Sequence, residues 1–218
     1  GDLLWHFQGG DPMGPPTVLL HGSFSSASSW GAQFGDFADA GLRLYAPERS
    51  GHGHSPERAG PSSFSSMADQ VIVYLENVVR EPANIVGWSD GGVVALMIAL
   101  RRPDLVARIV TTGSYVNRRG LAPIDDPDDH DGDDDAVIVE CLREGFLHSA
   151  SGNDASFDKT IAMLRVEPTF ETTDFAAVTA PTLVVAADCG IVRIEHSLDL
   201  ASTLPHGRLA VLPGTHIL

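Results

Sequence analysis

Residues 85–92, Ile-Val-Gly-Trp-Ser-Asp-Gly-Gly, constrain the fold more than any other stretch, because the apolar run 93–100 follows them directly. A buried strand that turns at once into a helix brings the two elements too close for side chains where they meet. Gly87 and Gly91, two positions before and after Ser89, satisfy that requirement. The spacing predicts a strand, a tight turn and a helix, with the Ser89 hydroxyl presented as a nucleophile. A glycine-rich turn with an incidental serine is the alternative.

Short apolar runs alternate with amphipathic segments along most of the chain. Strands are expected at residues 17–20, 42–46, 83–88, 108–112, 182–187 and 208–212, and helices at 67–79, 91–101 and 195–204. Strands and helices that alternate at this spacing predict an α/β fold, in which helices flank both faces of a mostly parallel sheet.

The alternation breaks between residues 121 and 178. This span contains no convincing strand, only helix-like segments at 137–148 and 157–165. We therefore expect a core domain formed by residues 1–120 and 179–218, with residues 121–178 inserted into it as a helical lid.

The length of the chain, 218 residues, suits one domain with a small insertion.

Charge and apolar content limit the partners of the chain. A net charge of −15 opposes binding to nucleic acid or to an anionic membrane, because both reward positive charge. The longest apolar run, residues 93–100, is too short to cross a bilayer. The oligomeric state leaves no signature in the sequence.

The location is predicted from the start of the chain and from its cysteines. No charged-then-apolar leader precedes the first strand, which predicts a protein that is not exported. Cys141 and Cys189 have neither metal-ligand spacing nor a framework of pairs. We expect two buried thiols in a reducing compartment, and hence a cytoplasmic protein.

Residues 125–135 form a strongly acidic run that raises the question of a calcium site, because hard cations bind oxygen ligands. The run lacks the bidentate Glu that ends an EF-hand loop, and blocks of like charge are commonly solvated. We therefore predict a mobile hinge of the lid here, and no metal.

Several motifs resemble those of the α/β-hydrolase family. They are the turn at 85–92, His21-Gly22-Ser23, the loop Glu-Arg-Ser-Gly-His-Gly-His-Ser at 48–55, the strand entry Ala-Pro-Thr-Leu-Val-Val at 180–185, and Gly214-Thr215-His216. The loop at 48–55 is similar to the family's Asp-x-Arg-Gly-x-Gly-x-Ser sequence, with Glu in place of Asp and an additional Ser. The resemblance covers about residues 17–118 and 179–217, and the chain begins short of the family's usual first hairpin.

The resemblance implies a catalytic triad in the chain order serine, acid, histidine. Ser89 would attack a carbonyl carbon while His216 takes its proton, since a serine hydroxyl is a weak nucleophile without a base. The backbone N–H groups of Ser23 and Asp90 would form the oxyanion hole, which binds the negative charge of the reaction intermediate.

The loop that should carry the acid departs from the family's pattern. Residues 187–190, Ala-Asp-Cys-Gly, stand where Gly-Asp-x-Asp or Gly-x-x-Asp is usual, so the usual acid position falls on Cys189 or Gly190. Asp188 is the only carboxylate in this loop, and we predict that it orients His216. Glu195, on the next helix, is the alternative.

Other residues near these motifs have weaker assignments. Phe24 and Trp88 are expected to line the acyl side of a substrate pocket, with plain core packing as the alternative. His52 and His54 are expected to stabilise the glycine-containing loop, and His196 is expected on a surface helix.

The predicted function is a cofactor-free serine hydrolase that cleaves a small apolar or aromatic ester or lactone. The resemblance also argues against haloalkane dehalogenase or epoxide hydrolase activity. Family members with those activities use Asp as the nucleophile, whereas this chain has a serine. Cleavage of carbon–carbon bonds and peracid formation remain open on the same triad. A non-catalytic ligand-binding member is the alternative from another class, because a fold alone does not determine function.

Overall fold

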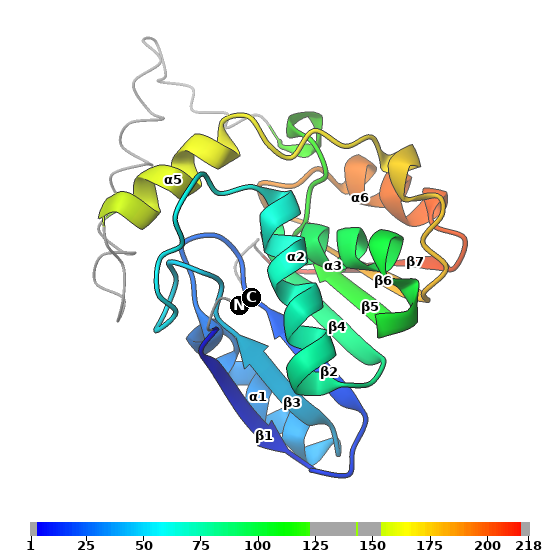
Figure 1. Ribbon diagram of the computed structural model, residues 1–218. Helices are drawn as coiled ribbons and strands as arrows, with labels where there is room; N and C mark the ends of the chain where they lie inside the picture. Colours follow the sequence, from blue (N-terminus) through cyan, green and yellow to red (C-terminus); the bar gives the residue numbers. More distant parts are fainter. Residues whose placement is uncertain (1–3, 123–142, 144–153, 215–218) are drawn as a thin grey trace.

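The structure, a computed structural model, describes residues 4–122, 143 and 154–214 (Figure 1). Seven strands form one sheet in the order β1-β3-β2-β4-β5-β6-β7. They are β1 (His6–Gly10), β2 (Pro16–Leu20), β3 (Arg43–Pro47), β4 (Ala83–Trp88), β5 (Val106–Thr112), β6 (Thr182–Ala187) and β7 (Gly207–Leu212). All neighbouring pairs are parallel except β1 with β3. The predicted α/β fold with a mostly parallel sheet is therefore confirmed.

Helices cover both faces of this sheet. They are α1 (Gly31–Asp39), α2 (Phe64–Tyr74) with its π-helical extension Leu75–Val79, α3 (Asp90–Arg101) and α6 (Ile194–Thr203). A further helix, α5 (Asp154–Leu164), lies apart from both faces of the sheet. Figure 1 shows α2, α3 and α6 on one face, with α1 behind the strands β1 and β3. Short 3-10 turns occupy residues 27–30, 103–105, 118–120 and 172–175.

Strand β1 and helix α1 were not predicted. The sequence of β1, His-Phe-Gln-Gly-Gly, has no apolar alternation, because this edge strand is mostly exposed. Helix α1 contains two glycines and has no buried residue, so its sequence gives little helical signal. Both elements therefore depend on their neighbours: β1 pairs antiparallel with β3, and α1 packs against those same two strands.

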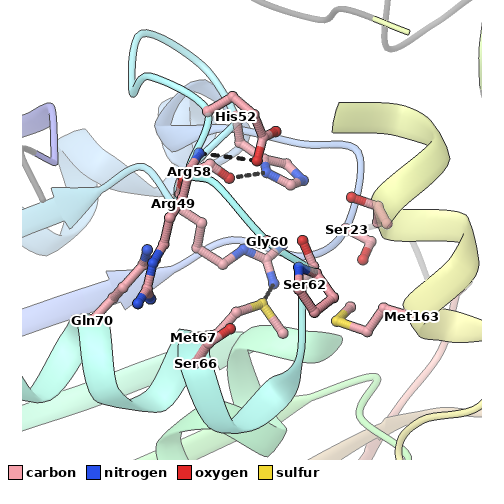
Figure 2. Close-up of a pocket in the computed structure, with 14 residues that line it drawn as sticks. Ser23, Arg49, His52, Arg58, Gly60, Ser62, Ser66, Met67, Gln70 and Met163 are labelled. Carbon is pink, nitrogen blue, oxygen red and sulfur yellow. Dashed lines mark hydrogen bonds between the residues drawn. The ribbon is translucent and has the colours of Figure 1, made fainter. Parts of the chain in front are cut away.

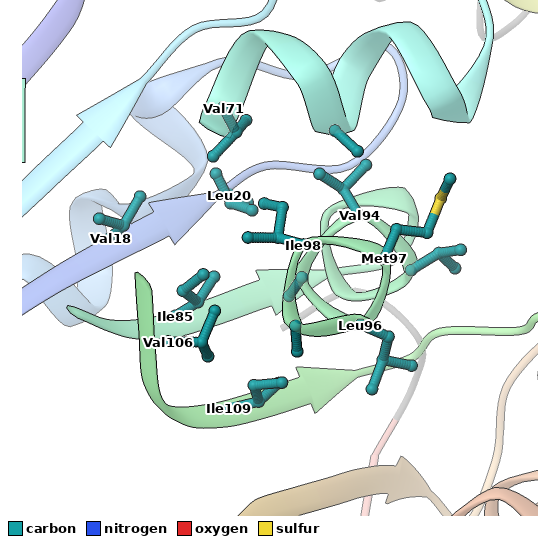
Figure 3. Packing of buried hydrophobic residues seen from close by; sticks show 14 of the residues in the cluster. Val18, Leu20, Val71, Ile85, Val94, Leu96, Met97, Ile98, Val106 and Ile109 are labelled. Atoms are coloured by element: carbon teal, nitrogen blue, oxygen red, sulfur yellow. The ribbon is translucent and has the colours of Figure 1, made fainter. Parts of the chain in front are cut away.

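The larger part of the core lies between the sheet and the helices α2 and α3. Ile85 and Ile109 of the central strands lie below α3, whose Val94 is on the side toward α2 (Figure 3). Helix α3 is apolar on every side, and its residues from Asp90 to Ala99 are buried. A helix that is apolar all round belongs in the centre of a domain. The first turn of α3, which directly follows Ser89, is therefore held rigidly.

The span predicted as a lid is described only in part. The expected helix at 157–165 is present as α5, which begins slightly earlier, at Asp154. The expected helix at 137–148 and the acidic run at 125–135 lie outside the described residues. The division into core and lid therefore stays a prediction.

Two expectations about polar side chains are wrong. His196 does not lie on the surface: it is 9% exposed, and its Nε2 accepts a 3.0 Å hydrogen bond from the backbone N–H of Val116. The ring is buried because it packs against Gly120, where a Cβ would lie closer to it than 3.0 Å. Cys189 is exposed rather than buried, and Cys141 lies outside the described residues.

None of the helices in the described part of the chain combines the length and the apolar character that spanning a membrane requires.

Candidate active site

Ser89 stands at the point where β4 ends and α3 begins. Its backbone has φ 53° and ψ −119°, a left-handed conformation that a residue with a side chain adopts only under strain. Hydrogen bonds to the next strand hold this conformation: the N–H of Ser89 donates to the carbonyl of Thr112 (2.8 Å), and the Ser114 hydroxyl donates to the carbonyl of Ser89 (2.8 Å). The predicted strand, turn and helix are therefore present, with Ser89 half-buried at the C-terminal edge of the sheet.

The turn at residues 21–23 passes directly beside Ser89. A Cβ at Gly22 would lie 3.1 Å from the Cβ of Ser89 and 3.2 Å from the ring of Trp88. Glycine thus allows this backbone to approach the serine closely. In the described residues, the backbone N–H of Ser23 has no hydrogen-bond acceptor. Asp90 is the first residue of α3, where a helix has no internal acceptor for the N–H.

Arg49 and Asp90 form a buried ion pair between two segments that are far apart in the sequence. The side chains are 7% and 3% exposed, and Nη1 of Arg49 lies 3.3 Å from Oδ2 of Asp90. The hydroxyl of Ser23 donates to the same Oδ2, and Nη2 of Arg49 donates to the carbonyl of Gly22 (2.5 Å). The sequence shows that the loop at 48–55 contains charged residues, but it does not indicate that Asp90 is the partner of Arg49.

His21 is also part of this buried cluster. Its Nε2 accepts from the backbone N–H of Arg49 (3.1 Å), so the ring proton sits on Nδ1, which donates to the carbonyl of Gly22 (2.8 Å). Burial, and then the charge of Arg49, lower the pKa of His21 well below its ordinary value. His21 is thus a neutral structural group and is not available as the base.

The loop at 48–55 is built around the buried carboxylate of Glu48. That carboxylate accepts from the backbone N–H of Ala27 (3.2 Å) and from the backbone and ring nitrogens of His54. Gly53 has φ 55°, and a Cβ there would collide with the Glu48 carboxylate. Nδ1 of His52 lies 3.1 Å from the carbonyl of Ser50, so both loop histidines take part in the turn, as expected.

Asp188 is exposed in the loop directly after β6. Its Oδ1 accepts a 2.9 Å hydrogen bond from the backbone N–H of Gly214, and its own N–H donates to the carbonyl of Leu212 (3.0 Å). The N–H of Cys189 donates to the carbonyl of Gly214 (3.1 Å). The structure thus brings Asp188 to the turn that leads into His216, which itself lies outside the described residues.

Glu195, the alternative acid, lies in the first turn of α6. Its carboxylate is 77% exposed and lies 3.9 Å from Nε of Arg193. Asp188 is exposed as well, but it contacts the backbone of Gly214, whereas Glu195 lies against Arg193, so Glu195 is the weaker candidate.

Phe24 and Trp88 pack against different groups of residues. Phe24, with φ 58°, has its ring centroid 4.8 Å from that of Phe157 on α5, and Phe157 is fully buried. Trp88 packs against the smaller core cluster beneath α1, which includes Leu19 and Trp30. The placement of Trp88 suits the core-packing alternative, and a role for either ring in a substrate pocket stays a prediction.

A small cavity lies beside the turn at 21–23, between the loop after β3 and the helices α2 and α5 (Figure 2). Figure 2 shows Arg49, His52 and Arg58 on the loop side and Met163 of α5 opposite them. Its volume is about 30 Å³, which suits one or two water molecules rather than a substrate. We therefore do not assign it as the substrate pocket.

No metal site is found in the described ranges 4–122 and 154–214: they hold no group of three His, Cys, Asp or Glu side chains arranged to bind an ion.

Lowering the pH below about 6.5 is expected to destabilise the fold. Burial lowers the pKa of His21 well below its ordinary value, that of His52 to about 3, and that of His196. These rings stay neutral in the fold while the unfolded chain takes up protons. Stability is therefore fully present above about pH 6.5, and below it falls by about 1.4 kcal/mol per pH unit for each histidine that stays neutral in the fold.

Urea unfolding at pH 7.5, 6.5 and 5.5 measures this dependence. The matched variant is His196→Gln, whose side-chain oxygen still accepts from the N–H of Val116 but does not titrate. We expect its free energy of unfolding to fall less than that of the wild type between pH 6.5 and 5.5. Equal slopes in the two proteins would contradict a neutral His196.

Comparison with known proteins gives three findings. The sequence pattern of the alpha/beta hydrolase family matches residues 17–217. Among curated proteins, the pimeloyl-[acyl-carrier protein] methyl ester esterase of Aromatoleum aromaticum is 39% identical over 100 residues, or 46% of this chain and 37% of that protein. The aligned part thus spans well under half of that relative.

Solved structures with the same fold cover nearly the whole chain. A hydrolase from Pseudomonas aeruginosa superposes with a TM-score of 0.80 at 20% identity, covering 100% of this chain and 88% of that one. The enol-lactonase from Burkholderia xenovorans superposes with a TM-score of 0.77 at 18% identity, covering 98% and 89%. At these identities, the likeness shows a shared fold and not a shared substrate.

Proposed function

Because the chain belongs to the alpha/beta hydrolase family, we propose that it is a serine hydrolase that cleaves a carboxylic ester or lactone. The observation that carries this proposal is the strained conformation of Ser89, with φ 53°, on the turn from β4 to α3. Such a turn exposes the hydroxyl at the edge of the sheet, where a substrate carbonyl can approach it.

In the proposed reaction, Oγ of Ser89 attacks the carbonyl carbon while His216 takes the hydroxyl proton. The carbonyl oxygen becomes negatively charged and accepts hydrogen bonds from the backbone N–H groups of Ser23 and Asp90. His216 then returns the proton to the leaving alcohol, and an acyl group remains on Ser89. A water molecule, deprotonated by His216, releases the acid and restores the serine. These steps require no cofactor.

Asp188 is our candidate for the acid that orients His216. Its 2.9 Å hydrogen bond from Gly214 supports this role, because Gly214 is two residues before His216 and two residues span at most about 7 Å. The loop is atypical in sequence, yet the side chain already points to the turn that leads into the histidine.

The proposed substrate is small and apolar or aromatic. The packing of Phe24 on Phe157 supports an aromatic wall beside the turn at 21–23, and it joins the core to the span proposed as a lid, residues 121–178. The names of the esterase relative and of the enol-lactonase are consistent with an ester or lactone. A cytoplasmic location remains part of the proposal.

Labelling with a fluorophosphonate probe, followed by intact mass and peptide mapping, tests the proposed function. We expect one adduct, located on Ser89, followed by turnover of simple aryl esters or lactones at a rate that rises as a group near neutral pH deprotonates. No adduct on a folded protein would overturn the proposal and favour a non-catalytic ligand-binding protein. An adduct with turnover of diketones but not esters would redirect it to carbon–carbon bond cleavage.

Replacing Asp188 with asparagine is expected to lower kcat/KM for an aryl ester by about 10³-fold or more. The amide oxygen still accepts from the N–H of Gly214, so the loop is retained and only the charge is lost. Glu195→Gln is the matched control and should change kcat/KM by less than about twofold. A large effect of Glu195→Gln with a silent Asp188→Asn would transfer the role to Glu195.

A further inference from the structure

The Arg49–Asp90 ion pair is a group whose burial needs an explanation. Both side chains are almost fully buried, and burial lowers the pKa of the Arg49 guanidinium. Two charges taken out of water seldom stabilise a fold more than apolar side chains of the same size would. A contribution to stability alone therefore does not account for the pair.

The pair connects the two segments that carry the proposed oxyanion donors. Asp90 directly follows Ser89 and begins α3, and its carboxylate accepts from the hydroxyl of Ser23. Arg49 holds that carboxylate from the other side and donates to the carbonyl of Gly22 (2.5 Å). The N–H groups of Ser23 and Asp90 thus belong to residues whose own side chains are joined.

Besides the hydrogen bonds of the His21 ring, the turn at 21–23 is held by the side chains of Asp90 and Arg49. A glycine at position 22 brings conformational freedom to a backbone that must stay beside Ser89. The next residue, Phe24, lies in the left-handed region, at φ 58°. The side-chain links to Asp90 and Arg49 compensate for this freedom, because they act on Ser23 and Gly22 themselves.

We infer that the Arg49–Asp90 pair, through the Ser23 hydroxyl, is a positioning device that holds the two backbone oxyanion donors at a fixed separation. This inference rests on the proposed function. A donor that drifts by a fraction of an ångström loses part of its stabilisation of the transition state, whereas substrate binding is unaffected. Ser23, Arg49 and Asp90 therefore act through backbone groups, and not by contact of their side chains with the substrate.

Ser23→Ala tests this directly, because it removes the hydrogen bond from the Ser23 hydroxyl to Asp90 but keeps both N–H donors, the ion pair and the Arg49–Gly22 hydrogen bond. We expect the maximal rate of fluorophosphonate labelling at Ser89, and kcat for an aryl ester, to fall about tenfold. KM and the non-covalent affinity for the probe should change by less than twofold. Ser23→Thr, which keeps a hydroxyl, should restore most of the rate.

Ser26→Ala is the matched control, since Ser26 lies in the same connection and its hydroxyl bonds only to the backbone N–H and the hydroxyl of Ser28 among the described residues. It should label at the wild-type rate, and melting temperatures should show that all variants are folded. A Ser23→Ala protein that labels as fast as the wild type would overturn the inference and leave the proposed function intact. A wild type that does not label at Ser89 would overturn both.

Discussion

Replacing Ser89 with alanine is expected to lower kcat for an aryl ester by about 10⁴-fold or more. The variant loses the oxygen that forms the acyl-enzyme, while the oxyanion donors and the rest of the site remain. The melting temperature should stay close to that of the wild type, because an alanine needs no more space at the same left-handed backbone position. Initial rates at saturating substrate, corrected for the uncatalysed reaction, measure the effect.

The control for this experiment is Ser28→Ala, an exposed serine in the first 3-10 turn. It should keep its rate within about twofold. A Ser89→Ala protein that retains a tenth of the wild-type rate would show that another group is the nucleophile. In that case the strained turn would serve the packing of β4 against α3 rather than catalysis.

Replacing Gly87 with alanine is expected to destabilise the fold by about 3–5 kcal/mol, a large part of the stability of a typical domain. A Cβ at this position would lie closer than 3.0 Å to the carbonyl group of Gly91 and to the nitrogen of Gly92. Those atoms are backbone and cannot rotate away, so α3 would have to shift from β4. Urea unfolding at pH 7.5 measures the loss.

Gly35→Ala is the matched control, because a Cβ at Gly35 meets no atom within 4 Å in the interior of α1. Alanine favours a helix over glycine by up to about 1 kcal/mol, so this variant should be as stable as the wild type or slightly more stable. Gly87→Ala with a stability near that of Gly35→Ala would contradict the close approach of helix and strand.

The sequence predicted the parts of the fold that local patterns describe. The apolar runs predict six of the strands, and the structure confirms all six. Each predicted end lies within two residues of the observed end. They do not reveal β1, because an exposed edge strand has no apolar pattern of its own and forms only by pairing with β3. They do not reveal α1 either, whose glycines weaken the helical signal.

The site residues, too, were predictable only where they lie close together in the sequence. Ser89 and its glycines are neighbours in the chain, so their spacing alone predicts the turn and its close approach. By contrast, Asp188 could not be placed from its motif, since the usual acid position falls on Cys189 or Gly190. Its contact with Gly214, 26 residues further along the chain, assigns it to the turn before His216.

The sequence by itself determined the strand, turn and helix around Ser89, because the close approach of Gly87 to Gly91 and Gly92 acts between residues four and five positions apart. Only the tertiary structure decided which distant charges meet. Arg49 reaches Asp90 across 41 residues, and the ring of His196 accepts from Val116 across 80. Such contacts depend on the order and register of the strands, and a desolvated polar group is stable only where those strands bring its partner.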